Sequence, residues 1–99
     1  MNYTAVMDFQ WDQHKSDACL QKRGFDFAYV AFAFADPDRI IRQDARFSYG
    51  EDQYELIGRI DGRVYVLVYT PRQDEIRIIS ARKANLREVK RYENRSHED

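Results

Sequence analysis

The sequence predicts an α+β domain built around an antiparallel β-meander, with the element order β-α-α-β-β-β-α. Apolar β-branched and aromatic runs at residues 64–69 and 75–80 flank a polar turn at 70–74, as in a β-hairpin. The Asp61-Gly62 dipeptide, between two further such runs, is a strong signal for a two-residue hairpin. The helices are expected only before and after these strands, and this segregation is typical of the α+β class.

The N-terminal segment is predicted to form a strand followed by a helix. Imperfect alternation of apolar and polar residues indicates a strand over residues 5–11. Asp12 is expected to cap a helix over residues 13–23, because its carboxylate can accept hydrogen bonds from the free amides of the first turn. Gly24 is the expected end of that helix.

A second, largely buried helix is expected over residues 27–35, with Asp26 as its cap. The Asp36-Pro37-Asp38 tripeptide ends it, since proline restricts the residue before it. Residues 40–41 are expected to be a short extended piece, followed by a polar linker over residues 43–50.

The C-terminal half is predicted to hold the meander and one more helix. Strands are expected at residues 53–60 and 63–70, and the hairpin at residues 64–80 supplies the last strand. Asn85 precedes Glu88 by three residues, the spacing of a capping box, and is expected to begin the final helix. Apolar residues at a spacing of three give that helix its inward side: Leu86, Val89 and Tyr92.

Ninety-nine residues suffice for one domain with one core. The domain is expected over residues 1–95, with 96–99 as a disordered tail. No apolar run approaches the roughly 18 residues that span a bilayer, and the N-terminus lacks the pattern of a signal peptide. The single cysteine, Cys19, suits a reducing cytoplasm. One cysteine and two distant histidines do not make a zinc site, so we expect neither metal nor cofactor.

The formal net charge of −1 argues against binding of nucleic acid by bulk charge, but the charges are unevenly distributed. Residues 1–56 hold six Lys/Arg and ten Asp/Glu, whereas residues 57–95 hold ten Lys/Arg and five Asp/Glu. The basic half is suited to phosphate and the acidic half to a basic partner. The alternative is that these charges simply cover the surface of a small domain.

Eight short motifs occur in a fixed order over about residues 7–93. They are FxWDxxK (9–15), KRGF (22–25), FADPDR (34–39), YGED (49–52), IGR (57–59), VYT (68–70), IRIISARKA (76–84) and ExxxY (88–92). In this combination the chain resembles the BrnT toxins of bacterial and archaeal type II toxin–antitoxin modules.

The resemblance implies a RelE-like fold and a ribonuclease activity that inhibits translation. It also implies neutralisation by a BrnA-type antitoxin in a 2:2 heterotetramer. The antitoxin would carry a ribbon–helix–helix domain, so DNA would be bound only through it. The sequence departs from the family at Arg23, where many members have histidine, and near Phe47, where some do. A mechanism with histidine at either place is therefore not open to this chain.

RNA cleavage without a metal proceeds by attack of the ribose 2′-OH on the neighbouring phosphorus. Positive charge must then stabilise the phosphoryl oxygens, and the planar guanidinium of arginine donates two parallel hydrogen bonds to phosphate. Arg77, which faces opposite to its apolar neighbours on the last strand, and Arg82, just beyond, are the leading catalytic candidates. Alternatively, Arg77 pairs with Glu55 or Glu51, and Arg82 is a surface charge or a salt-bridge partner.

The proton-transfer candidates are Glu51 and Tyr69, since His14 lies in the first helix and His97 in the tail. Glu51 starts from an ordinary pKa of about 4.3 and would need it raised to be an efficient base. Alternatively it is a surface acid paired with arginine. Tyr69 can donate a hydrogen bond to phosphate or stack on a base, or it can simply close the core.

Four further cations are candidates for RNA binding. Lys22 lies at the end of the first helix, where the helix dipole alone favours a cation. Arg59 alternates with Ile57 and is expected to share the face of Arg77. Arg72 lies at a turn, where the alternative is simple solvation, and Lys83 precedes the free amides of the final helix.

The sequence therefore predicts a metal-independent endoribonuclease toxin. The rival hypothesis is a non-catalytic interaction module, or an inactive toxin relic that serves with a partner as transcriptional co-repressor. The missing histidines favour this rival slightly.

Overall fold

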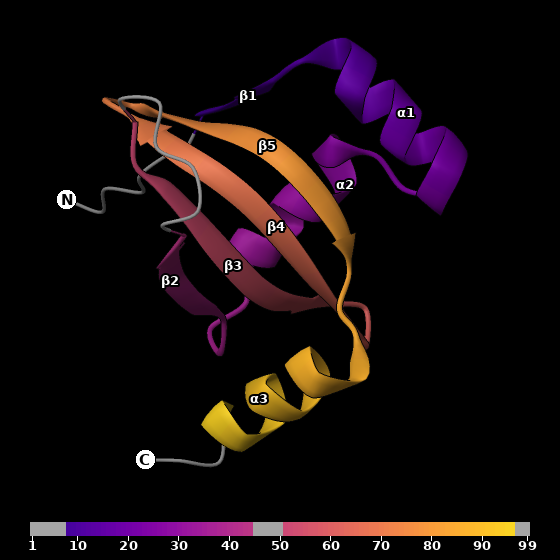
Figure 1. The fold of residues 1–99 in the computed structure, drawn as a ribbon, viewed down its shortest axis with the longest axis vertical. Coiled ribbons are helices and arrows are strands. Elements are labelled where there is room, and N and C mark those ends of the chain that lie inside the picture. Colours follow the sequence, from indigo (N-terminus) through magenta and orange to yellow (C-terminus); the bar gives the residue numbers. More distant parts are fainter. Residues whose placement is uncertain (1–7, 45–50, 97–99) are drawn as a thin grey trace, which may run out of the picture.

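The computed structural model describes residues 8–44 and 51–96, and it shows a five-stranded sheet with helices packed on it (Figure 1). The order of the strands across the sheet is β1-β5-β4-β3-β2. The strands are β1 (Asp8–Trp11), β2 (Ile40–Asp44), β3 (Gln53–Ile60), β4 (Arg63–Arg72) and β5 (Glu75–Lys83). The helices are α1 (Gln13–Arg23), α2 (Phe27–Val30), the 3₁₀ helix η1 (Ala31–Ala35) and α3 (Leu86–Ser96).

The α+β class is confirmed, but the predicted element order lacks one strand. Residues expected only as a short extended piece form β2, which pairs antiparallel with β3. The sheet is also not purely antiparallel, because β1 pairs parallel with β5. The sequence pattern marks β1 as a strand, but the choice of a neighbour more than 60 residues away depends on tertiary packing.

The caps of the first two helices are as predicted. The carboxylate of Asp12 accepts hydrogen bonds from the backbone N–H groups of His14 and Lys15, and Gly24 ends α1 in the left-handed conformation with φ +88°. Asp26 caps α2 by accepting from the N–H of Tyr29. The single helix expected over residues 27–35 is instead one α-helical turn that tightens into η1, as helices often do near their ends.

The later turns and the last helix also follow the sequence signals. Asp61 and Gly62 both have positive φ, as a type I′ hairpin requires. The next turn is shorter than the predicted 70–74, because β4 runs to Arg72 and β5 begins at Glu75. In α3, the capping box of Asn85 and Glu88 forms in both directions. The expected tail at 96–99 begins inside α3, and residues 97–99 lie outside the described part.

A β-bulge interrupts the pairing of β4 with β5. Ile78 lies opposite Tyr69 and Ser80 lies opposite Val68, so Ile79 is an extra residue without a partner on β4. Successive side chains of a strand alternate between faces, and one extra residue reverses that alternation. The bulge therefore turns Arg77 and Arg82, five residues apart, to the same face of the sheet.

The two faces of the sheet are covered differently. On one face, α1, α2 and η1 enclose the main core, whose largest buried side chains include Phe27, Leu56 and Ile78. On the other, α3 packs on a small cluster formed by Ile57, Val64, Val66 and Tyr92. We call these the α1/α2 face and the α3 face. Figure 1 shows α3 at one end of the sheet, so it leaves the remainder of its face uncovered.

Candidate functional site

The part of the α3 face that α3 does not cover is polar. Cross-strand register and strand alternation bring side chains from five strands to this surface, which we call the polar face. Its members include Gln10 on β1, Arg42 on β2, Glu55 on β3, Thr70 and Arg72 on β4, and Glu75 and Arg77 on β5. Residues far apart in sequence thus form one surface with three guanidinium groups.

Arg77 lies within this surface, opposite Thr70 on β4 and Gln10 on β1. Its Nη1 donates a hydrogen bond of 2.8 Å to Oε1 of Gln10, whose side-chain amide donates in turn to Glu75. The group that accepts this hydrogen bond from Arg77 is therefore a neutral amide and not a carboxylate. A guanidinium held in this way is fixed in direction and suited to an incoming anion.

Glu55 and Glu51, the expected alternative partners of Arg77, pair with other arginines. Glu55 accepts a hydrogen bond of 2.9 Å from Nε of Arg42, and only 10% of its side chain is exposed. Glu51 pairs with Arg72, with Nε 3.0 Å from Oε2 and Nη2 3.2 Å from Oε1. The expected alternative of a surface acid paired with arginine is therefore correct for Glu51. Because Arg72 belongs to the polar face, Glu51 lies at the end of that face.

Arg82 shares the α3 face but binds the protein itself. Its Nη1 and Nη2 donate hydrogen bonds of 2.8 Å to the two carboxylate oxygens of Glu88, which is buried. These bonds lower the pKa of Glu88 to about 2. The structure thus shows the expected alternative for Arg82, a salt bridge. This salt bridge connects the end of β5 to the first turn of α3.

Arg59 also helps to hold α3 on the sheet. Its guanidinium lies 5.1 Å from the ring centre of Tyr92, a cation–π contact. Its backbone N–H donates to Asp36, which also accepts a hydrogen bond from the Tyr92 hydroxyl. Arg59 thus shares the face of Arg77, as expected, but lies at the covered end.

The remaining three candidates lie away from the polar face. Tyr69 belongs to the core of the α1/α2 face, with its ring 4.9 Å from that of Phe34, and burial raises its pKa. Its place there follows from alternation, since both strand neighbours of Tyr69 point to the α3 face. Lys22 and Lys83 are exposed and line two separate cavities, of about 290 and 520 Å³. The sequence-predicted residues therefore do not form one site.

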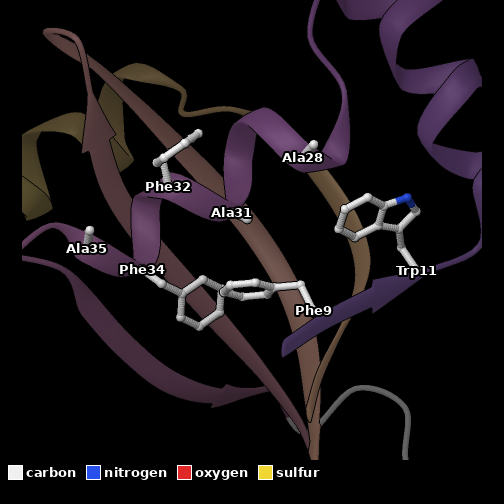
Figure 2. Close-up of a pocket in the computed structure, with 7 residues that line it drawn as sticks. All are labelled: Phe9, Trp11, Ala28, Ala31, Phe32, Phe34 and Ala35. Carbon is white, nitrogen blue, oxygen red and sulfur yellow. The ribbon is translucent and has the colours of Figure 1, made fainter. Parts of the chain in front are cut away.

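The α1/α2 face carries a cavity of about 460 Å³ with the opposite chemistry (Figure 2). The rings of Phe9 and Phe34 lie against each other on one side, Trp11 lies on another, and Phe32 projects from η1. Alanines complete the lining, and no charged side chain of the described residues takes part: Ala28, Ala31 and Ala35. The one side-chain donor in this described lining is the indole N–H of Trp11, which donates to Gln13, and the lining carries no positive charge, so the cavity is not a phosphate site.

Other kinds of site find little support among residues 8–44 and 51–96. In these ranges no three His, Cys, Asp or Glu side chains come together as potential metal ligands. Cys19 is buried against Ala81, and burial raises the pKa of its thiol, which makes it a poor nucleophile. Within the same ranges, no helix has the length and apolar character needed to cross a membrane.

Comparison with known families decides the class of this protein. The family model described as "Ribonuclease toxin, BrnT, of type II toxin-antitoxin system" matches residues 11–88. The chain belongs to the BrnT family. Comparison with curated proteins finds no match. BrnT toxins are described as ribonucleases of a type II module, and this class fits a polar face rich in arginine. The matched segment holds Arg42, Glu55 and Arg77, whereas Gln10 and most of α3 lie outside it.

Sequence reasoning did not identify Gln10, Arg42, Thr70 or Glu75 as members of the polar face and considered Glu55 only as a partner of Arg77. Gln10 carried no signal, because its contact with Arg77 crosses 67 residues of sequence. Arg42 lay in a segment not recognised as a strand. Glu55 had a usable signal: alternation places it with Ile57 on a strand that is largely buried, where an acid requires a partner.

Proposed function

We propose that this BrnT-family chain is an endoribonuclease that cleaves RNA on the polar face without a metal ion and thereby inhibits translation. The observation that carries the proposal is the pairing of Arg77 on β5 with neutral Gln10 on the neighbouring edge strand β1. It leaves an oriented guanidinium on a rigid sheet. Phosphate in a transition state with extra negative charge is the ligand that such a group stabilises best.

The reaction we propose is a transesterification. The ribose 2′-OH loses its proton to a carboxylate and attacks the adjacent phosphorus, while the 5′-oxygen leaves and takes up a proton. The products are a 2′,3′-cyclic phosphate and a free 5′-OH. Arg77 binds the phosphoryl oxygens. The proton acceptor is Glu55, one strand removed from β5, or Glu51 at the end of the face.

Both carboxylates already pair with an arginine, Glu55 with Arg42 and Glu51 with Arg72. Catalysis therefore depends mainly on charge and positioning, and we expect a modest rate. Arg72, on the same face, is the candidate for contact with a neighbouring phosphate. Arg82 and Arg59 act through α3 as positioning residues, and Lys22, Lys83 and Tyr69 take no part.

The partner we propose is a BrnA-type antitoxin, with a ribbon–helix–helix domain that alone contacts DNA. Membership of a type II toxin family implies an antitoxin. The order of the sequence motifs supports the BrnA type, the 2:2 complex, a RelE-like fold and a cytoplasmic setting. Copurification of the chain with the product of an adjacent short gene, followed by mass measurement of the complex, tests the stoichiometry.

The test of the activity is incubation of the purified chain with RNA in the presence of EDTA. We expect cleavage by the wild type, and loss of at least about 100-fold of it in Arg77→Ala, a decrease typical for removal of a transition-state donor. Circular dichroism and urea denaturation must show that the variant still folds. Unchanged cleavage by folded Arg77→Ala would remove this residue from the mechanism. Glu51→Gln and Glu55→Gln, compared in the same assay, separate the two proton acceptors.

The rival function, a toxin relic that acts as co-repressor, is favoured by one observation: the described polar face holds no histidine. Growth arrest on expression, relieved by coexpression of the adjacent antitoxin gene, would support the ribonuclease. Harmless expression of a folded chain that still represses the shared promoter together with its partner would support the relic.

A further inference from the structure

A strongly basic groove runs along α3, between this helix and β2. Four cations recur along this helix at spacings of three and four residues, so they lie on one side of it: Arg87, Lys90, Arg91 and Arg95. Asn94 joins them, and Ile40 of β2 forms the opposite wall. The groove has a volume of about 470 Å³. It is distinct from the polar face in its residues, and we call it the α3 groove.

All the charged side chains described in the lining of the α3 groove are positive. No carboxylate occurs among its described lining residues. The helix carries two acids: Glu88 is turned toward the sheet, where it binds Arg82, and Glu93 is exposed and is not among the lining residues. The Nη1 atom of Arg91 is buried and has no hydrogen-bond partner within the described residues. A buried guanidinium N–H without an acceptor is costly, so the side chain of Arg91 retains an unmet capacity for hydrogen bonding.

The α3 groove adjoins the polar face. Ile40, its wall, lies two residues before Arg42 on β2, so the two side chains point to the same face of the sheet. Cross-strand pairing continues that face from Arg42 to Glu55 on β3. A chain of phosphates that crosses the polar face near Arg77 can therefore continue along β2 into the groove without passing around an edge of the sheet.

We propose that the α3 groove binds the phosphodiester backbone of the RNA strand beside the cleaved bond. The inference rests on the proposed ribonuclease function and extends its substrate site to Arg87, Lys90, Arg91 and Arg95. No aromatic side chain is among the described lining residues, so the groove has no platform for stacking a base. The contact is therefore to phosphate and does not depend on sequence.

The lining favours RNA over an acidic protein segment. Helical peptides that dock in grooves use several apolar anchors spaced along one side. Ile40 is the single apolar residue described in the lining, and the other residues are charged or polar. Such a surface fits a uniformly charged polymer, whose binding releases counterions and falls steeply with salt.

The experiment compares the double variant Arg87→Ala/Lys90→Ala with the matched control Arg23→Ala/Arg63→Ala. Both remove two exposed cations, but the control pair lines a different cavity. The binding probe is a fluorescent oligoribonucleotide made uncleavable by 2′-O-methylation, titrated at several salt concentrations. For two lost phosphate contacts, the slope of log affinity against log salt should weaken by about 1.4 in the groove variant. The control should keep the wild-type slope and affinity.

Cleavage supplies an independent readout. With a long RNA we expect the groove variant to show a raised KM and an unchanged kcat, whereas cleavage of a dinucleotide, too short to reach the groove, stays at the wild-type rate. Equal affinity and slope in the groove variant and the wild type would overturn the inference. An equal loss in the control variant would overturn it as well, because bulk charge would then explain the effect.

The experiments distinguish failure of the groove proposal from failure of the proposed ribonuclease function. Groove-dependent, salt-sensitive binding by a chain that cleaves no RNA supports the groove and contradicts the ribonuclease. Cleavage with no effect of the groove variant contradicts only the groove. If the groove variant binds RNA normally but no longer binds the antitoxin, the surface belongs to a protein partner, and the inference is wrong.

Discussion

The carboxylate of Glu88 accepts a hydrogen bond of 2.8 Å from each terminal nitrogen of Arg82, and this ion pair joins α3 to the end of β5. The same carboxylate accepts a hydrogen bond from the backbone N–H of Asn85, so one buried side chain completes both the helix cap and the ion pair. Arg82, a catalytic candidate in the sequence analysis, thus stabilises the attachment of α3 to the sheet.

We expect this pair to make folding stability depend on acid pH. The pKa of Glu88 is lowered to about 2 from 4.5, chiefly by Arg82. A lowered pKa in the folded state means that the unfolded chain binds the proton more readily. The contribution of Glu88 is therefore complete above about pH 4.5 and is lost as the pH falls toward 2. Urea denaturation should show Glu88→Gln less stable by about 2 kcal/mol at neutral pH, with the difference shrinking below pH 4.5. A difference that does not vary with pH would contradict this.

The amide of Gln10 should matter to cleavage through Arg77. We expect Gln10→Ala to lower kcat about 10-fold, equal to about 1.4 kcal/mol, with little change in KM. Gln10→Glu should be worse, because a carboxylate would pair with Arg77 and neutralise the charge meant for phosphate. Steady-state kinetics of the two variants with one RNA substrate provide the measurement. Wild-type kcat in Gln10→Glu would show that Arg77 does not act through its charge.

Removal of the Tyr69 hydroxyl should leave cleavage within about twofold of wild type. Tyr69 lies in the core on the α1/α2 face, and a phenylalanine of nearly the same shape keeps its contacts with Phe34 and Tyr54. The assay is RNA cleavage by Tyr69→Phe under the conditions used for Arg77→Ala. Loss of activity in a variant with wild-type stability would restore Tyr69 as a proton-transfer group.

The contact of β3 with η1 should not tolerate an added methyl group. A Cβ at Gly58 would lie 3.0 Å from the carbonyl oxygen of Ala33 and 3.2 Å from its Cβ. Because both atoms belong to the backbone or to its first side-chain carbon, neither can rotate away. We expect Gly58→Ala to lose about 1–3 kcal/mol of the free energy of unfolding, measured by urea denaturation. Unchanged stability would mean that η1 shifts freely on the sheet.

The tyrosine on α3 should titrate last. Burial and a hydrogen bond of 2.6 Å to Asp36 raise the pKa of Tyr92 to about 12. The folded state therefore holds this proton more tightly than the unfolded chain, so its stabilising contribution is complete below about pH 10 and is lost as the pH rises toward 12. Ultraviolet titration of phenolate should show a transition near pH 12 that is missing in Tyr92→Phe. Ionisation of every tyrosine near pH 10 would exclude the buried hydrogen bond.

Local signals in the sequence were sufficient for much of the fold. The caps at Asp12 and Asn85 and the turn at Asp61-Gly62 depend on neighbouring residues only, and all form as expected. β2 escaped prediction because it is a short edge strand, mostly exposed, without the apolar alternation that marks a half-buried strand. The parallel pairing of β1 with β5 escaped because the contact crosses most of the chain.

The candidate site was predictable only in part for the same reason. The outward direction of Arg77 follows from simple alternation, and it holds. Simple alternation also places Arg77 and Arg82 on opposite faces, which is wrong because Ile79 forms a bulge that no residue type signals. The choice between partners was likewise not local: Glu55 pairs with Arg42 through strand register, and Glu51, which precedes β3, pairs with Arg72 of β4.

The place of β1 beside β5 sets the order in which a newly synthesised chain becomes complete. Gln10 leaves the ribosome early, but it meets Arg77 only after 67 further positions have been translated. Contacts of such long sequence separation form late in folding. A chain that ends before β5 therefore lacks both Arg77 and the strand that pairs with β1, so the polar face is complete only when synthesis of the domain is almost over.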